Sequence, residues 1–402
     1  MEQSVEKYSV FALPKSIWSI GLVTLLVNLS SVIIFSLSPI YLTTILGVST
    51  FNLGILEGVV EATSLFTRIF SGVLSDYLYR RKPILIFAYA LSALSRPIFA
   101  IATSLGWIAG ARIIDRVSNG LQATPREALV GDLAPKSLKG ACFGLRQTLS
   151  MVGSFAGAGI VMFLMHHTNE NYQIIFWVAA VPPILAVLAL IFFVQDSPIA
   201  ERHHAKISFW AHLRHTRHLN KQYWRVVFVA GIFMFSNYSG AYMILQGTNQ
   251  GLSPSQVPIL MVLQNLFAFA SAYPMGRLSD RFDRRILIGV GFIITMISNA
   301  FFAMAHEPTF VLIGASLWGL QMGMTQSLLL TKVADTTFTE IRGTGFGIYY
   351  LIVGVTIFLS NTLTGWIFTH KSPSAAFWLS ACVAGIALLF LPFLESSQKA
   401  KR

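Results

Sequence analysis

The stretch GVLSDYLYRRKPIL, residues 72–85, returns in altered form as GRLSDRFDRRILIG at residues 276–289. Both copies place a glycine, a leucine, a serine and an aspartate ahead of two arginines. The tripeptide Gly-Leu-Gln at residues 120–122 also recurs, at residues 319–321, with a similar offset of about 200 residues. The repeat indicates that the chain consists of two copies of one unit.

The composition is that of a membrane protein. Hydrophobic residues make up 54% of the chain and charged residues only 11%, whereas charged residues are about a quarter of a soluble domain. The 402 residues leave room for about a dozen spans of about 20 residues each. We therefore predict an all-α protein with twelve transmembrane helices, at 17–40, 52–75, 83–104, 107–126, 140–165, 172–194, 224–248, 255–276, 284–305, 308–331, 341–368 and 374–394.

The basic residues predict the orientation of these helices. They gather in alternate turns, whereas the opposite turns hold almost none apart from Lys371. Basic turns stay on the cytoplasmic side, so both termini are expected there. The net charge of +12 reflects these turns, and we do not infer nucleic-acid binding from it. The lipid bilayer is the expected partner surface.

Six spans per repeat is an even number, so both copies insert the same way up. They are then related by a pseudo-twofold axis along the membrane normal. The predicted organisation has five parts. They are a cytoplasmic N-terminus (residues 1–16), a six-helix bundle (17–195), a basic linker (196–223), a second six-helix bundle (224–394) and a cytoplasmic tail (395–402).

Twelve spans with the phrase G-x-L-[SA]-D-x-x-x-R-[RK] after spans 2 and 8 resemble the major facilitator superfamily. The run DRVSNGLQATPREALVGD at residues 115–132 is similar to a bacterial subgroup without a single assigned substrate. The resemblance implies a secondary active transporter that works by alternating access in the bacterial cytoplasmic (inner) membrane. It implies a small-molecule substrate, no enzymatic activity and no cofactor, and we expect a monomer.

The repeated phrase has two interpretations. Its basic residues can act only as topological anchors. Alternatively, Asp76 contacts a helix end and a nearby arginine, for which Arg126 is our candidate. The resemblance implies that such a cluster holds the cytoplasmic side shut. The predicted cytoplasmic gate comprises Gly72, Asp76, Arg80, Arg81, Arg126, Gly276, Asp280 and Arg284.

Ionisable residues inside the membrane are costly and usually functional. The first half holds eight of them, at Glu57, Glu61, Arg68, Arg96, Arg112, Asp115, Arg116 and Arg146. At about 1.5 Å per residue, six of these reach a similar depth, with Arg68 and Arg146 at another level. One interpretation is a static ion-pair network. The other is proton coupling.

For proton coupling, Glu61 is the first candidate and Asp115 the second. Glu57 shares a helix face with Glu61. The resemblance adds Arg116, whose counterpart in span 4 is associated with proton coupling. The surplus of arginines favours symport of an organic anion or a carboxylate-bearing, metal-chelating substrate. Ala158 stands where many proton-antiporting exporters of the family carry proline, which also favours uptake over export.

Neutral polar and aromatic residues dominate the second half. Tyr238, Tyr242 and Gln246 step by four along span 7, so they form a stripe on one face. Such groups bind a substrate by hydrogen bonds and stacking, although they also hold helices together. The predicted substrate-binding residues are Arg96, Arg112, Tyr238, Tyr242, Gln246, Gln264, Asn265 and Gln321.

Several alternatives remain at this stage. Proton-antiport export of amphipathic drug-like compounds competes with anion uptake. A membrane receptor built on a transporter scaffold is a different class, but it usually carries a larger soluble module. His212, His215 and His218 of the linker are spaced by three; because basic residues interleave with them, we predict a surface amphipathic helix and no metal site.

Overall fold

The computed structural model describes residues 13–78, 80–135, 138–196, 219–279, 282–337 and 342–394. The linker histidines, Asp280 and both chain ends therefore lie outside the described residues. Within the described residues the chain is helical and contains no strand.

The first half consists of long helices joined by short turns. They are α1 (Lys15–Ile40, continued by a π-helical turn Tyr41–Ile45), α2 (Thr50–Leu78), α3 (Lys82–Ile101), α4 (Leu105–Leu133), α5 (Lys139–His167) and α6 (Tyr172–Phe193). Several extend beyond the predicted spans at their charged ends. Hydropathy detects only the apolar part of a helix, so the sequence prediction for α4 stopped at residue 126.

The second half repeats this pattern, with one difference. It consists of α8 (Lys221–Phe235), α9 (Gly240–Asn249), α10 (Pro258–Leu278), α11 (Arg284–Ala303), α12 (Pro308–Asp335), α13 (Arg342–His370) and α14 (Pro373–Leu389), followed by a 3₁₀ turn at Leu391–Phe393. The predicted span 224–248 corresponds to one candidate membrane span, Lys221–Asn249, but its helix is interrupted between α8 and α9.

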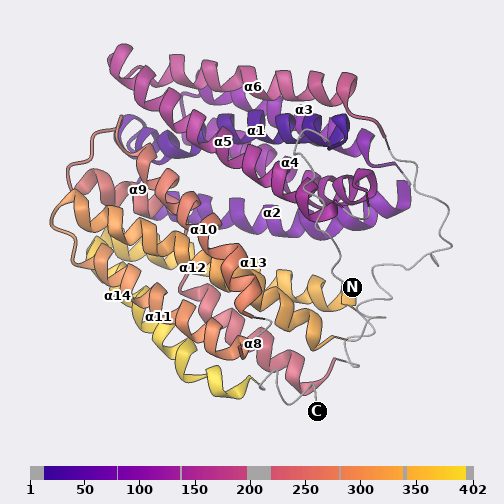
Figure 1. The fold of residues 1–402 in the computed structure, drawn as a ribbon. Coiled ribbons are helices and arrows are strands. Elements are labelled where there is room, and N and C mark those ends of the chain that lie inside the picture. The colour runs from indigo at the N-terminus through magenta and orange to yellow at the C-terminus, as the bar shows by residue number, and fades with distance from the viewer. Residues whose placement is uncertain are drawn as a thin grey trace.

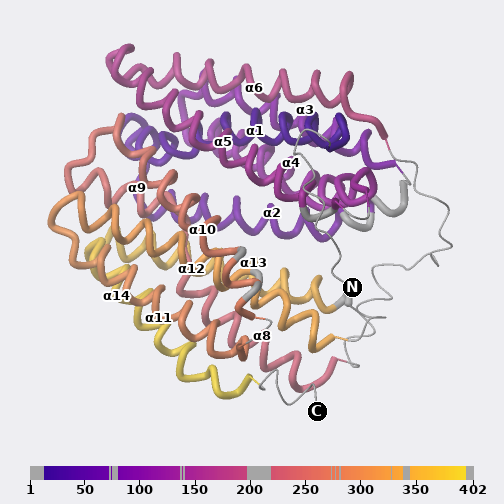
Figure 2. The backbone as a smooth tube through the Cα atoms, in the orientation of Figure 1, coloured from indigo at the N-terminus to yellow at the C-terminus, as the bar shows by residue number. Residues whose placement is uncertain are grey.

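The two halves form two bundles, with α1–α6 in one and α8–α14 in the other (Figure 1). At their boundary α2 and α13 lie side by side (Figure 2). Nine helical segments of the described residues are long and apolar enough to cross a membrane. The helices α2, α4 and α12 fall outside this group because charged or polar side chains interrupt their apolar sequence.

Equivalent glycines pack equivalent helices in the two halves. Gly120 of α4 lies against α2, where an added methyl group would overlap the backbone oxygen of Ser64. Gly319, its counterpart in α12, lies against α10, where a methyl group would overlap the backbone oxygen of Gln264. Small residues at such crossings let helix backbones approach closely. The sequence repeat is therefore a structural repeat.

Candidate transport site

The interruption between α8 and α9 lies at residues 236–239 and has its own hydrogen bonds. Asn237 Nδ2 donates to the backbone oxygen of Phe233 at 2.9 Å. Ser239 is the N-cap of α9, and its Oγ accepts from the backbone N–H of Ala241 at 3.2 Å. These side chains replace part of the helical hydrogen bonding, as capping residues do.

Helix α13 satisfies further backbone groups of the break. Ser360 Oγ contacts the backbone oxygens of Phe235 and Asn237 at 2.8 and 2.7 Å. Asn361 Oδ1 accepts from the backbone N–H of Ser239 at 2.8 Å. Irregular backbone at membrane depth needs such partners and usually lines a cavity, and the break of this chain does so.

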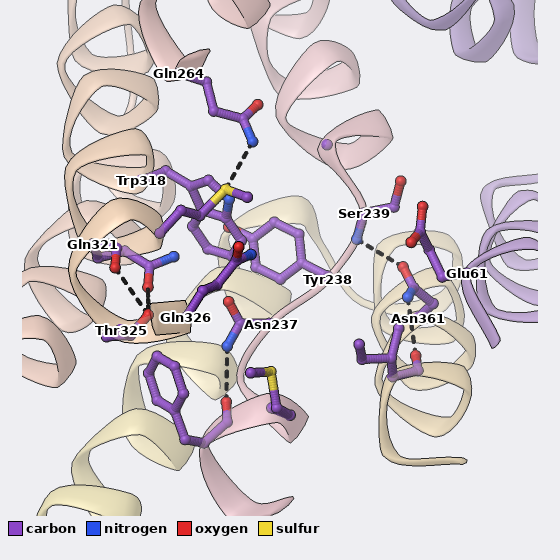
Figure 3. A pocket seen from close by; sticks show the side chains of 15 residues that line it. Glu61, Asn237, Tyr238, Ser239, Gln264, Trp318, Gln321, Thr325, Gln326 and Asn361 are labelled. Atoms are coloured by element: carbon purple, nitrogen blue, oxygen red, sulfur yellow. Dashed lines mark hydrogen bonds between the residues drawn. The ribbon is translucent and has the colours of Figure 1, made fainter. Parts of the chain in front are cut away.

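A cavity of about 230 Å³ opens beside the break. Fourteen of its lining residues belong to the second half, and Glu61 comes from α2 in the first half. Figure 3 shows Glu61 entering on the side where Ser239 and Asn361 lie. The lining residues are Glu61, Phe233, Met234, Asn237, Tyr238, Ser239, Gly240, Gln264, Trp318, Gln321, Met322, Thr325, Gln326, Ile357 and Asn361.

The wall of the cavity is aromatic and polar but mostly uncharged. The rings of Tyr238 and Trp318 lie 4.6 Å apart between centroids. Gln264 Nε2 contacts the sulfur of Met322 at 3.1 Å. Gln321 Oε1 accepts from Thr325 at 3.2 Å, whereas Gln321 Nε2 is buried without a hydrogen-bond partner among the described residues. This nitrogen is a donor without a partner in the described part of the chain, on a residue that lines the cavity.

The six charges predicted at one depth form three ion pairs between neighbouring helices. Glu57 of α2 makes a two-pronged contact with Arg112 of α4, in which Oε2 and Nη2 are 3.0 Å apart. Asp115 pairs with Arg96 of α3 at 2.7 Å and accepts from Ser92 at 3.1 Å. These two pairs are buried, with at most 7% of any of the four side chains exposed.

The third pair, Glu61 with Arg116, differs from the other two. Its closest nitrogen and oxygen are 3.7 Å apart, and 36% of the Glu61 side chain is exposed. The Arg116 guanidinium lies over the Phe35 ring at 4.2 Å, and Arg112 lies over the same ring at 5.3 Å. Phe35 thus contacts both arginines by cation–π interactions. Glu61 is the charged member of the cavity lining.

The predicted substrate-binding residues separate into two groups. Tyr238, Gln264 and Gln321 line the cavity, and the other five do not. Tyr242 donates to the backbone oxygen of Asn361 at 2.8 Å, and Gln246 donates to that of Phe302 at 2.9 Å. Both side chains are buried in helix contacts. Of the remaining three, Arg96 and Arg112 are held in the buried pairs, and Asn265 is partly exposed outside the lining.

The predicted gate residues that the structure describes lie in or beside the ends of α2, α3, α4, α10 and α11. Arg81 pairs with Asp132 at 3.1 Å, and Arg284 pairs with Asp335, so each contact joins residues of one half. Arg126 contacts Glu127 at 3.2 Å, the same carboxylate that Arg146 reaches.

The other described members of the predicted gate are placed by their position in the fold. Arg80 is exposed, Gly72 and Asp76 lie in α2, and Gly276 lies in α10. The side chain of Asp76 is outside the described part of the chain, so the expected contact with Arg126 stays a prediction.

Sequence reasoning missed several residues of the site. Ser239, Trp318, Met322 and Phe35 were not predicted to take part. The run Ser-Asn-Tyr-Ser at 236–239 carries a usable signal, because serine and asparagine favour helix caps over helix interiors. The tryptophan and methionine resemble any apolar core residue in the sequence.

The Major Facilitator Superfamily model matches residues 20–249 and 228–402 of the chain. The chain belongs to this superfamily. An uncharacterized MFS-type transporter of Methanocaldococcus jannaschii is 25% identical over 391 residues, 94% of this chain and 95% of that protein. The multidrug transporter protein MdtP of Bacillus subtilis is 25% identical over 181 residues, 42% of this chain and 33% of that protein.

A solved structure shares the fold. The structure of the nucleoside transporter NupG aligns with a TM-score of 0.79 at 10% identity, covering 94% of this chain and 100% of that one. The superfamily member described here is therefore a multi-pass membrane transporter for a small molecule, in a helical fold of two bundles.

Proposed function

We propose that transport is coupled to protons and that Glu61 is the carboxylate that binds the proton. The observation that carries this proposal is the position of Glu61 in the cavity lining, with 36% of its side chain exposed. Glu57 and Asp115 are buried and bonded at shorter distances. A carboxylate reached from a cavity can exchange a proton when the cavity opens or closes, since solvation and the nearby Arg116 act oppositely on its charge.

The cavity supports a neutral or cationic amphipathic substrate. The prediction of an anionic substrate depended on arginines at the cavity, but Arg96 and Arg112 are buried in ion pairs and do not line it. The lining offers amides, hydroxyls and aromatic rings beside one carboxylate. Such a wall suits an aromatic compound that accepts a hydrogen bond from Gln321 and places a donor or cationic group near Glu61.

This arrangement favours export over uptake. A cationic group and a proton compete for the same carboxylate, so one leaves as the other binds, and the two move in opposite directions. Protons run inward across a bacterial inner membrane, where we place the protein as a monomer with both termini in the cytoplasm. The exchange then moves the compound out of the cell.

The test uses purified protein in liposomes with an imposed pH gradient. The probes are tetraphenylphosphonium and ethidium, which are cationic and aromatic. We expect the gradient to drive probe movement in the unmodified protein and in Glu307→Gln, a control that changes an exposed residue before α12. Glu61→Gln should bind the probe but lose the response to the gradient. The proposal fails if Glu61→Gln retains that response.

A further inference from the structure

One hydrogen bond crosses the boundary between the halves at a buried carboxylate. Ser239 Oγ, at the start of α9, donates to Glu57 Oε2 of α2 at 2.8 Å. Glu57 is 1% exposed, and Arg112 of α4 holds its carboxylate from within the first half. The backbone N–H of Ser239 is held by Asn361 of α13. Both partners of the bond are therefore fixed in place by other residues of their own half.

The helices around this bond are in close contact. At Gly54 of α2, an added methyl group would overlap the hydroxyl of Tyr242 and the backbone oxygen of Asn361. At the start of α2, Thr50 Oγ1 lies 2.7 Å from Thr369 Oγ1 of α13. The two halves are therefore closed against each other where α2 begins and α13 ends.

The arginine-rich ends of the helices lie at the opposite end of the bundle. The start of α2 packs on the end of α13 through Gly54 and Gly365, so the end of α2 lies near the start of α13. There, the ion pairs Arg81–Asp132 and Arg284–Asp335 stay within a half. The Ser239–Glu57 bond belongs to the end that is closed between the halves.

We propose that Ser239 and Glu57 form a latch that fastens α9 to α2 when this end of the transporter is closed. Ser239 is a positioning residue, and Arg112 orients the acceptor. A hydrogen bond to a carboxylate is stronger than one between neutral groups. Because the chain is unwound at residues 236–239, α9 can shift without carrying α8 with it. The latch goes beyond the proposed proton exchange, since it needs no proton on Glu61.

A disulfide reporter measures closure of this end. The adjacent hydroxyls of Thr50 and Thr369 mark the reporter positions, so we use Thr50→Cys with Thr369→Cys. The background carries Cys142→Ala and Cys382→Ala, which remove the native thiols. The rate of cross-linking under a mild oxidant in liposomes reports how often the two helices are in contact.

Two serine variants separate the latch from helix capping. Ser239→Gly deletes the hydroxyl while glycine remains an acceptable N-cap. Ser372→Ala deletes the capping hydroxyl of α14, which bonds Ala375 N at 3.1 Å within the second half. We expect Ser239→Gly to slow cross-linking about tenfold, as loss of a hydrogen bond to a charged group allows. Ser372→Ala and Ser239→Thr should cross-link at the parent rate.

An unchanged rate in Ser239→Gly overturns the latch. If that variant fails to fold, the double variant Glu57→Met with Arg112→Met removes the acceptor together with its buried counter-charge, and the same slowing is expected. An unchanged rate in the double variant also overturns the proposal. The outcome is independent of the pH-gradient test, since neither cross-linking series alters Glu61.

Discussion

At the scale of single residues, the buried pair Arg96–Asp115 gives a prediction about stability. Arg96 is 0% exposed, so Arg96→Leu leaves Asp115 buried without its counter-charge. We expect a loss of about 3–5 kcal/mol in unfolding free energy, measured by thermal unfolding in detergent. Arg96→Leu combined with Asp115→Asn should recover much of the loss, because it removes both charges. Equal stability of the single and double variants would contradict this account.

Two glutamines provide a second contrast at this scale. Gln321 Nε2 has no hydrogen-bond partner among the described residues at the cavity wall, whereas Gln246 Nε2 donates to Phe302. We expect Gln321→Leu to weaken binding of rhodamine 6G, a cationic aromatic probe whose ester carbonyl can accept a hydrogen bond, with little change in melting temperature. Gln246→Leu should lower unfolding free energy by about 1 kcal/mol and leave affinity unchanged. Titration calorimetry and thermal unfolding measure the two effects, and reversed outcomes would exclude Gln321 from the substrate contact.

The charged residues of the site were predictable, but their exposure was not. Counting residues along spans 2 to 4 was enough to predict that carboxylates and arginines share a depth, and the structure pairs them. Which pair faces the cavity depends on how each helix is rotated against its neighbours. Glu57 and Glu61 share a face of α2, yet one is sealed by Arg112 and Ser239 while the other is exposed.

At the scale of helices, glycine substitutions test the packing. Gly319 of α12 meets the backbone of α10, whereas a methyl group added at Gly159 of α5 would have nothing within 4 Å. We expect Gly319→Ala to lower the melting temperature, because backbone atoms must move apart. Gly159→Ala should be neutral or slightly stabilising, since alanine favours helix over glycine. A larger loss for Gly159→Ala than for Gly319→Ala would contradict the packing described.

The break between α8 and α9 shows where prediction of helices from sequence fails. Hydropathy is continuous across residues 221–249, which together pass as one candidate span. The interruption depends on partners far along the chain, such as Ser360 and Asn361. A local sequence pattern cannot show that these partners are present.

At the scale of the whole molecule, the composition and the repeat predicted two six-helix bundles, and the resemblance carried by the repeated phrase predicted the superfamily. The orientation in the membrane gives a further prediction. In a background without native cysteines, Glu307→Cys at the closed end should react with an impermeant maleimide in intact cells. Arg80→Cys, at the arginine-rich end, should react only after the membrane is permeabilised, because basic turns stay in the cytoplasm. The reverse labelling would invert the proposed orientation.

The central claim is that Glu61 exchanges a proton for the substrate, and proton release on binding tests it most directly. Tetraphenylphosphonium is added to purified protein in weakly buffered detergent solution at mildly acidic to neutral pH, and a pH-indicator dye records the protons released. We predict release from the unmodified protein and from Glu307→Gln, and none from Glu61→Gln at saturating probe. Equal release from Glu61→Gln, or probe binding by the unmodified protein without release at any pH, would contradict the account.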